Sequence, residues 1–194
     1  HYLFLCEGGG KTVRLAHPDG GVIVELRGDG SQTMVPPSTH PDGQQLSVKD
    51  WHPDASHHHY DSLYQLLHRV GALALLMQGW HVGSRHQLSL SFAGLCQSLG
   101  ISYDDAYEMV QLLCHVTYDD EENARLNNVR LTYHRPTASN IGFTGLCEVI
   151  DKASADKVSD WLCKAYGLRP TGTQVTVSSN DVISLETISR PEHV

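Results

Sequence analysis

The stretch VIVELRGDGSQTMVPPS, residues 22–38, sets the expected fold of the first third of this 194-residue chain. Residues 22–26 are aliphatic except for Glu25, and β-branched aliphatic residues favour a strand. The glycines of RGDG favour a tight turn after it. A further strand is expected at 33–35, and Pro36 ends it because proline cannot donate a hydrogen bond to a strand ladder.

The same alternation of short strands and turns extends upstream, and a polar loop follows downstream. HYLFL at 1–5 predicts an apolar strand, and 12–15 alternates as a half-buried strand does. Glycine and proline punctuate the intervening segments. We therefore expect β-structure over residues 1–50 and a linker over 51–60.

From about Asp61 the apolar period changes from two to 3.6, which predicts helices. Gly100 stands where a helix C-cap residue is expected, and Ser102 with Asp105 has the spacing of a capping box. The helical segments indicate a bundle over 61–167, and an extended or loose tail is expected over 168–194. One helical face carries Leu63, Leu66, Leu67, Val70, Leu73 and Met77. The predicted fold class is α+β.

Composition and charge limit the functional classes. The chain is 40% hydrophobic and 19% charged, so it can bury a core, and it has no apolar run long enough for a bilayer span. No membrane association is expected, and a cytoplasmic protein is the simplest interpretation. The net charge of −8 argues against a protein coated in basic charge, although a few arginines can still grip nucleic acid locally. The five cysteines, none in a CxxC pair, are expected to be mostly buried free thiols.

Glu25 is the residue in the opening stretch that suggests chemistry. A carboxylate beside a buried strand is costly unless it is paired or binds a cation. Arg27 lies on the same strand face, and Ser38 and His40 follow a rigid Pro-Pro and could offer donors to phosphate oxygens. Together they fit metal-assisted nucleotidyl transfer. The alternative is that Glu25 and Arg27 form only a salt bridge beside a hairpin.

The run ELRGDGSQTMVPPSTHPDG resembles the third motif of primase-polymerase domains of the archaeo-eukaryotic primase superfamily over about twenty residues. In that family an acidic residue at the strand end helps to hold catalytic Mg²⁺ or Mn²⁺, which corresponds to Glu25, where the family often has Asp. The resemblance implies nucleotide contacts at Arg27, Ser38 and His40. HYLFL is similar to the family's second motif, which implies a catalytic, phosphate-contacting role for His1.

The resemblance also implies which part of the family fold the chain holds. The family's first motif, a pair of acidic residues one apart, precedes the histidine motif, and nothing precedes His1 here. We therefore expect the C-terminal part of a catalytic domain, a partial primase-type antiparallel or mixed sheet, followed by the helical bundle. Alternatively, another chain supplies the first motif. The implied activity is synthesis and extension of primers on single-stranded DNA from nucleoside triphosphates, in plasmid, phage or mobile-element replication and often with a replicative helicase.

The start of the second predicted helix, GSRHQ at 83–87, is similar to the helical domain that follows many of these primase domains. Arg85 and His86 at a helix N-terminus could meet a phosphate of the DNA. Ordinary polar residues at a helix start are an equally good interpretation.

Two further functional alternatives follow from the residues. A degenerate, non-catalytic primase-like module could bind DNA or a replication partner. A metal-dependent nuclease built on Glu25 is a poorer fit, because the acidic runs at 104–105 and 119–122 stand at helix starts, where they complement the dipole. The histidines at 57–59 are interpreted as a solvated linker, since adjacent side chains point in different directions.

Overall fold

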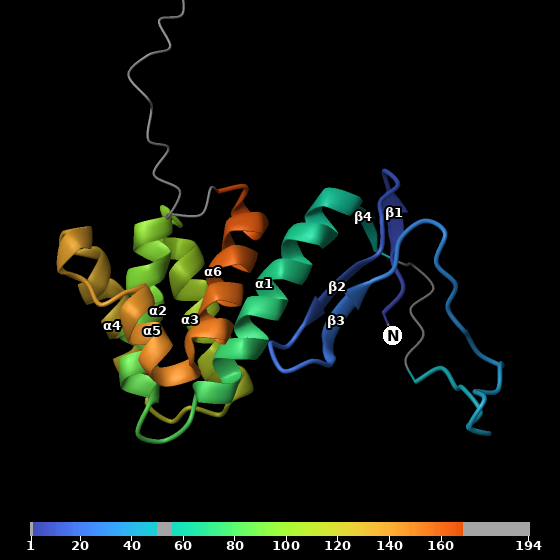
Figure 1. Cartoon of the computed structure of the whole chain (residues 1–194), viewed down its shortest axis with the longest axis horizontal. Coiled ribbons are helices and arrows are strands. Elements are labelled where there is room, and N and C mark those ends of the chain that lie inside the picture. Colours follow the sequence, from blue (N-terminus) through green and yellow to red (C-terminus); the bar gives the residue numbers. More distant parts are fainter. Residues whose placement is uncertain (1, 50–55, 169–194) are drawn as a thin grey trace, which may run out of the picture.

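Two small two-stranded sheets and six α-helices make up residues 2–49 and 56–168, which are the residues that the computed structural model describes (Figure 1). The α+β class is confirmed, but the described sheets are too small to identify a primase-type sheet. The elements are β1 (Leu5–Glu7), β2 (Val13–Ala16), β3 (Val22–Leu26), β4 (His57–His59), α1 (Tyr60–Gly79), α2 (Arg85–Leu99), α3 (Tyr103–Val116), α4 (Glu122–Tyr133), the 3-10 turn η1 (Thr137–Ser139), α5 (Phe143–Ile150) and α6 (Lys152–Tyr166).

Strands β2 and β3 form an antiparallel hairpin. In its register Val13 lies opposite Leu26 and Arg14 lies opposite Glu25. The turn is closed by backbone hydrogen bonds between His17 and the glycines after it, as the HPDGG sequence indicates. The hairpin therefore places Arg14 and Glu25 side by side across the strands.

Gly28, which follows the hairpin in the RGDG stretch, is required by a close backbone approach. A Cβ on Gly28 would lie 2.0 Å from the carbonyl oxygen of Gly10. The next residue, Asp29, donates its amide to that same oxygen at 2.8 Å. This glycine therefore holds the chain after β3 against the segment that leads into β2.

The six helices share one apolar core with the hairpin. Helix α1 packs against α6, and α2 packs against both α4 and α5. The expected caps are confirmed: Gly100 is left-handed at φ 82°, and the Ser102 hydroxyl accepts from the Asp105 amide at 3.1 Å. Within residues 2–49 and 56–168, none of the helices combines the length and the hydrophobicity needed to cross a bilayer.

A glycine in the middle of α1 lets the hairpin rest on the bundle. A Cβ on Gly71 would lie 2.5 Å from Leu15 Cδ1 of β2 and 3.0 Å from the ring of Trp161 on α6. Leu15 is buried there. At the other end of the hairpin, His17 Nε2 lies 2.9 Å from Gln78 Oε1 of α1. Figure 1 shows the hairpin lying along one side of α1, with α6 on the other.

The strand expected at 33–35 is absent from the structure. Arg27 donates to the carbonyl of Gln32 and to the hydroxyl of Thr33, so side-chain contacts rather than a ladder hold this segment. The first strand is also shifted, since it spans Leu5–Glu7 instead of 1–5.

Two further elements differ from expectation. The histidines at 57–59, expected as a linker, form β4 and pair in parallel with β1. Helix α5 was not predicted, although the apolar residues Phe143, Leu146, Cys147 and Ile150 have helical spacing. The tail from 169 and the linker residues 50–55 lie outside the described residues.

The thiols differ sharply in exposure, which yields a first prediction. All five cysteines are free; Cys96, Cys114 and Cys163 are buried, and Cys6 is exposed. Burial raises the pKa of each buried thiol, that of Cys114 to about 12. Because the thiolate is the reactive form, we expect iodoacetamide to label Cys6 roughly a hundredfold faster than the three buried thiols in the native chain. Mass spectrometry of timed samples checks this, and equal rates in native buffer would contradict the packing.

Candidate functional site

Glu25 sits between two arginines on the face of the β2–β3 hairpin. Arg14 Nε donates to Glu25 Oε1 at 2.8 Å, and Arg27 Nε lies 3.4 Å from Oε2. The hydrogen bond from Arg14, followed by the charges of both arginines, holds the pKa of Glu25 below its usual range. The carboxylate is therefore charged at neutral pH and engaged through both oxygens. The ion pair of Glu25 with Arg27, which was the alternative to a role in chemistry, is present. Arg14 is a second partner that the sequence pattern did not indicate.

Arg27 also faces an open hollow of about 790 Å³ formed by the loop after the hairpin. Its Nη1 donates to the carbonyl of Gln32 at 2.7 Å and to Thr33 Oγ1 at 2.9 Å. His40 lines the same hollow, and its Nδ1 lies 2.9 Å from Asp42 Oδ1. The hollow is lined by Arg27, Ser31, Gln32, Thr33, Met34, His40 and Leu46.

The structure thus brings together two of the expected nucleotide contacts, Arg27 and His40. Ser38 belongs to the same loop, where its amide donates to the Val35 carbonyl and its carbonyl accepts from the Leu46 amide. Ser38 does not line the hollow. The expected contact at His1 lies outside the described residues.

Glu25 does not form a metal site with the other described residues. Mg²⁺ and Mn²⁺ are held by several oxygen ligands, and a two-metal centre needs several carboxylates. Over residues 2–49 and 56–168 no three His, Cys, Asp or Glu side chains are placed to hold a metal ion. Both Glu25 oxygens face guanidinium groups instead. The donor set around Glu25 therefore suits an anion-binding arginine pair better than a cation.

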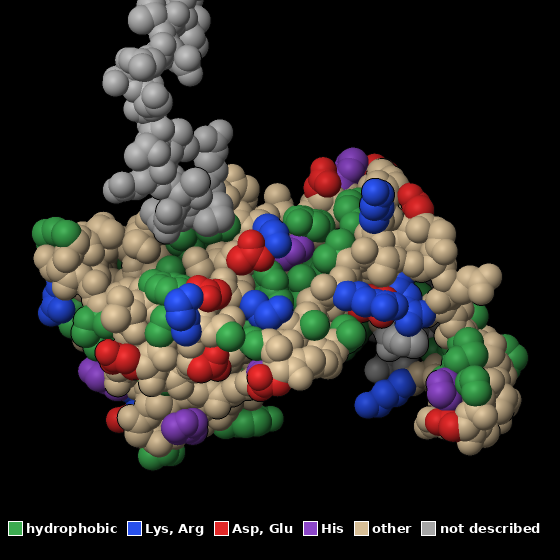
Figure 2. Space-filling view, in the orientation of Figure 1, with side chains coloured by type: hydrophobic (Ala, Val, Ile, Leu, Met, Phe, Trp, Pro, Cys, Tyr) green, Lys and Arg blue, Asp and Glu red, His purple; other side chains and the backbone are tan. Residues whose placement is uncertain are grey.

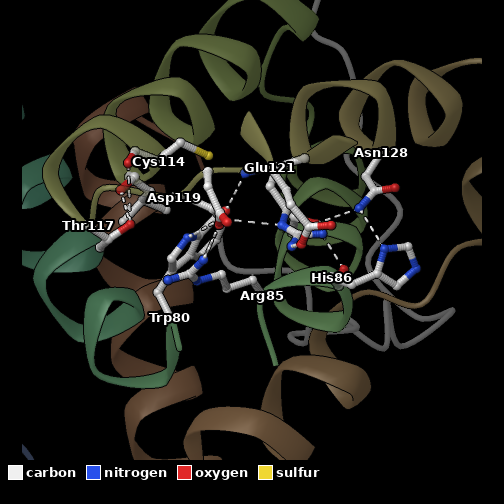
Figure 3. Close-up of polar contacts among 12 residues, drawn as sticks. Trp80, Arg85, His86, Cys114, Thr117, Asp119, Glu121 and Asn128 are labelled. Carbon is white, nitrogen blue, oxygen red and sulfur yellow. Dashed lines mark hydrogen bonds and ion pairs between the residues drawn. The ribbon is translucent and has the colours of Figure 1, made fainter. Parts of the chain in front are cut away.

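Arg85 and His86 are engaged in contacts within the bundle (Figure 3). Arg85 Nη1 donates to Asp119 Oδ1 at 3.1 Å and to Asp120 Oδ1 at 3.2 Å, and its side chain is only 14% exposed. His86 Nδ1 lies 3.2 Å from the side-chain amide of Asn128. These contacts favour the alternative interpretation, a structural role at the helix start.

The carboxylate of Asp119 is the centre of a buried polar network that was not predicted from the sequence. Its Oδ2 accepts from Trp80 Nε1 at 3.0 Å and lies 3.3 Å from Arg125 Nε. Its Oδ1 accepts from the Glu121 amide at 3.0 Å and from Arg85. The side chain is fully buried, so these donors replace water around the charge. The network joins the end of α1 and the start of α2 to the α3–α4 connection.

The donors outweigh the cost of burial for Asp119. Burial alone would raise its pKa, but the Glu121 amide, the Trp80 indole and the two arginines hold the pKa below its usual range. Asp119, predicted to complement a helix dipole at a helix start, thus has a different role. No helical period signals this role, because α3 ends at Val116 and Asp119 lies in the connection that follows it.

Removing the Asp119 carboxylate is expected to destabilise the bundle strongly. In Asp119→Ala the buried Arg125 and the partly buried Arg85 each lose their buried carboxylate partner, and breaking a buried pair costs about 3–5 kcal/mol. Asp120→Ala is the matched control, because Asp120 also contacts Arg85 but its side chain is 87% exposed. The control should lose less than about 1 kcal/mol. Urea unfolding followed by circular dichroism measures both, and equal losses would contradict the role given to the network.

The lowered pKa of Asp119 sets the direction of a pH dependence. A carboxyl whose folded pKa is depressed contributes stability that is fully present above its unfolded pKa of about 3.9 and is lost as pH falls through the folded value. We expect the free energy of unfolding to fall below about pH 4 and to fall less steeply in Asp119→Asn. Urea titrations from pH 6 to pH 2.5 measure this, and identical acid limbs would contradict it.

Comparison of the chain with protein-family models, curated proteins and solved structures found no match. The chemistry of the site therefore rests on its residues. The Asp119 network is buried and its arginines are neutralised, so it stabilises the bundle. In the cluster of Arg14, Glu25 and Arg27 both arginines reach solvent, and Arg27 lines a hollow. Of the two, only the hairpin cluster can meet a ligand.

Proposed function

We propose that this chain binds the triphosphate of a nucleotide at the β2–β3 hairpin, as part of a primase-polymerase that synthesises and extends primers on single-stranded DNA. The observation that carries the proposal is the convergence of Arg27 and His40 on one hollow beside the charged Glu25. In the sequence these residues belong to the run that resembles the third primase-polymerase motif. Their joint position is what a phosphate-contacting role requires.

The electrostatics of the chain favour the hairpin over the bundle as the phosphate site. The chain carries a net charge of −8, so an anionic ligand needs a local concentration of cationic donors. In the bundle, Arg85 and Arg125 are bound by the Asp119 carboxylate. At the hairpin, Arg27 keeps a 42% exposed side chain and lies next to hydroxyl donors such as Thr33. Guanidinium groups match phosphate oxygens in geometry and charge.

The nucleotidyl-transfer step needs more metal-binding carboxylates than the described residues bring together at the hairpin. Joining a nucleotide to a primer with Mg²⁺ or Mn²⁺ needs several carboxylates around the ions. Glu25 is one such group, and both of its oxygens are occupied by arginines. In this proposal further carboxylates come from residues beyond those described or from a partner chain. Single-stranded DNA and a replicative helicase are the partners that the family resemblance implies.

Nucleotide binding tests the proposal directly. We expect ATP or dATP to bind the chain in isothermal titration calorimetry, with and without Mn²⁺. Arg27→Ala should weaken that binding roughly tenfold or more, because hydrogen bonds to charged groups contribute about 1.5–3 kcal/mol. His40→Ala should weaken it as well.

Arg130→Ala is the matched control, since Arg130 is exposed on α4 and its guanidinium donates only to Asn127 among the described residues. The nucleotide affinity of Arg130→Ala should equal that of the unaltered chain. Absence of nucleotide binding by the unaltered chain, or equal losses in Arg27→Ala and Arg130→Ala, would contradict the proposal.

A second candidate function is a non-catalytic module that binds DNA. It is favoured by the engagement of both Glu25 oxygens with arginines, which leaves two exposed guanidinium groups for the phosphates of DNA. The two functions differ in the ligand that is required. Binding of single-stranded DNA together with no affinity for nucleotides would support the module.

A further inference from the structure

We infer that Arg14 and Arg27, held apart by the carboxylate of Glu25, form a paired guanidinium clamp that binds phosphate groups without a metal ion. The inference rests on the proposed function, because it describes how the same site would hold its ligand. It assigns a ligand contact to Arg14 and makes Glu25 a positioning residue for two cations. The inference starts from the observation that both Glu25 oxygens contact arginines and are not available to a metal ion.

The register of the hairpin places Arg14 in the site. Arg14 lies directly opposite Glu25 across the β2–β3 pair, so the two side chains share a face of the hairpin. Arg27, two residues after Glu25, shares that face as well. The salt bridges at 2.8 Å and 3.4 Å use one oxygen of Glu25 for each arginine. Each guanidinium therefore contacts a different oxygen of the carboxylate.

Both guanidinium groups keep donors for a ligand. Arg14 uses its Nε on Glu25, and Arg27 uses Nε on Glu25 and Nη1 on Gln32 and Thr33. Within residues 2–49 and 56–168, Arg14 Nη1, Arg14 Nη2 and Arg27 Nη2 have no hydrogen-bond partner. The side chains are 63% and 42% exposed, whereas Glu25 is only 18% exposed. The free donors thus face solvent above a largely covered carboxylate.

The charge balance of the cluster suits an anion. Two guanidinium groups and one carboxylate leave a net positive charge, and Figure 2 shows Lys and Arg side chains gathered near the hairpin. Because Glu25 already holds both arginines in place, a ligand does not have to order two long side chains on binding. A chain of oxygens that bridges two guanidinium groups, as in a triphosphate, is the matching ligand.

The test uses inorganic tripolyphosphate as the probe, with EDTA present to remove metal ions. We expect the unaltered chain to bind it in calorimetry and Arg14→Gln to bind it about tenfold more weakly, because charge-assisted hydrogen bonds are lost. Arg130→Gln, which removes an equal charge from helix α4, should stay within about twofold of the unaltered chain. The affinity of Arg14→Lys should lie between those of Arg14→Gln and the unaltered chain, since lysine keeps the charge but lacks the paired donors of a guanidinium.

Urea unfolding curves show whether a loss of binding comes from loss of the fold. Arg14 is mostly exposed, so Arg14→Gln should unfold at the same urea concentration as the unaltered chain. Equal tripolyphosphate affinity in Arg14→Gln and the unaltered chain would overturn the clamp. So would binding that disappears in EDTA.

Failure of the clamp and failure of the proposed function give different results. If the chain binds ATP through Arg27 but Arg14→Gln has no effect, the clamp alone is wrong. If the unaltered chain binds neither ATP nor tripolyphosphate under any metal condition, the proposed function is wrong and the clamp falls with it.

Discussion

The packing of Leu15 on Gly71 is the contact on which the position of the site depends. A two-stranded hairpin has little stability of its own in water, so β2 and β3 need a surface on which to bury their apolar face. Helix α1 offers that surface where Gly71 lacks a side chain, with Trp161 of α6 behind it. Leu15 fills this place and is almost fully buried. Its neighbour Arg14 points to the opposite face, and the pairing with Glu25 follows from the hairpin register.

The same arrangement, a carboxylate between two arginines, occurs twice among the described residues with different consequences. Around Asp119 the groups are buried, and the donors satisfy the carboxylate completely. Such a network joins the helix ends, and each of its arginines is paired with carboxylates. Around Glu25 the arginines extend into solvent and keep unused donors. Exposure, and not the type of residue, separates the structural cluster from the candidate binding site.

Much of the helical part could be predicted from the sequence, because its signals are local. The 3.6-residue spacing from Leu63 onward, the left-handed Gly100 and the cap at Ser102 each depend on neighbours within a turn or two. The missed helix α5 is short and follows a proline-containing segment, so its few apolar positions were not recognised. The strand expected at 33–35 is not formed, and Arg27 instead contacts this segment at the Gln32 carbonyl and the Thr33 hydroxyl.

The candidate site was only partly predictable for a related reason. The link between Glu25 and Arg27 spans two residues and follows from strand periodicity. The partnership of Glu25 with Arg14 depends on the register of the hairpin, which spacing alone did not define. The Asp119 network joins residues from Trp80 to Arg125, and no local pattern reports such a contact. The β4 pairing of His57–His59 with β1 is likewise a contact between distant segments.

The most direct test of the account is nuclear magnetic resonance of the arginine Nε–H groups during a titration with ATP in the absence of metal. The account expects the signals of Arg14 and Arg27 to shift together and to saturate at one affinity, while those of Arg85 and Arg125 stay in place. Unchanged signals for Arg14 and Arg27, or larger shifts for the arginines around Asp119, would contradict a phosphate site at the hairpin.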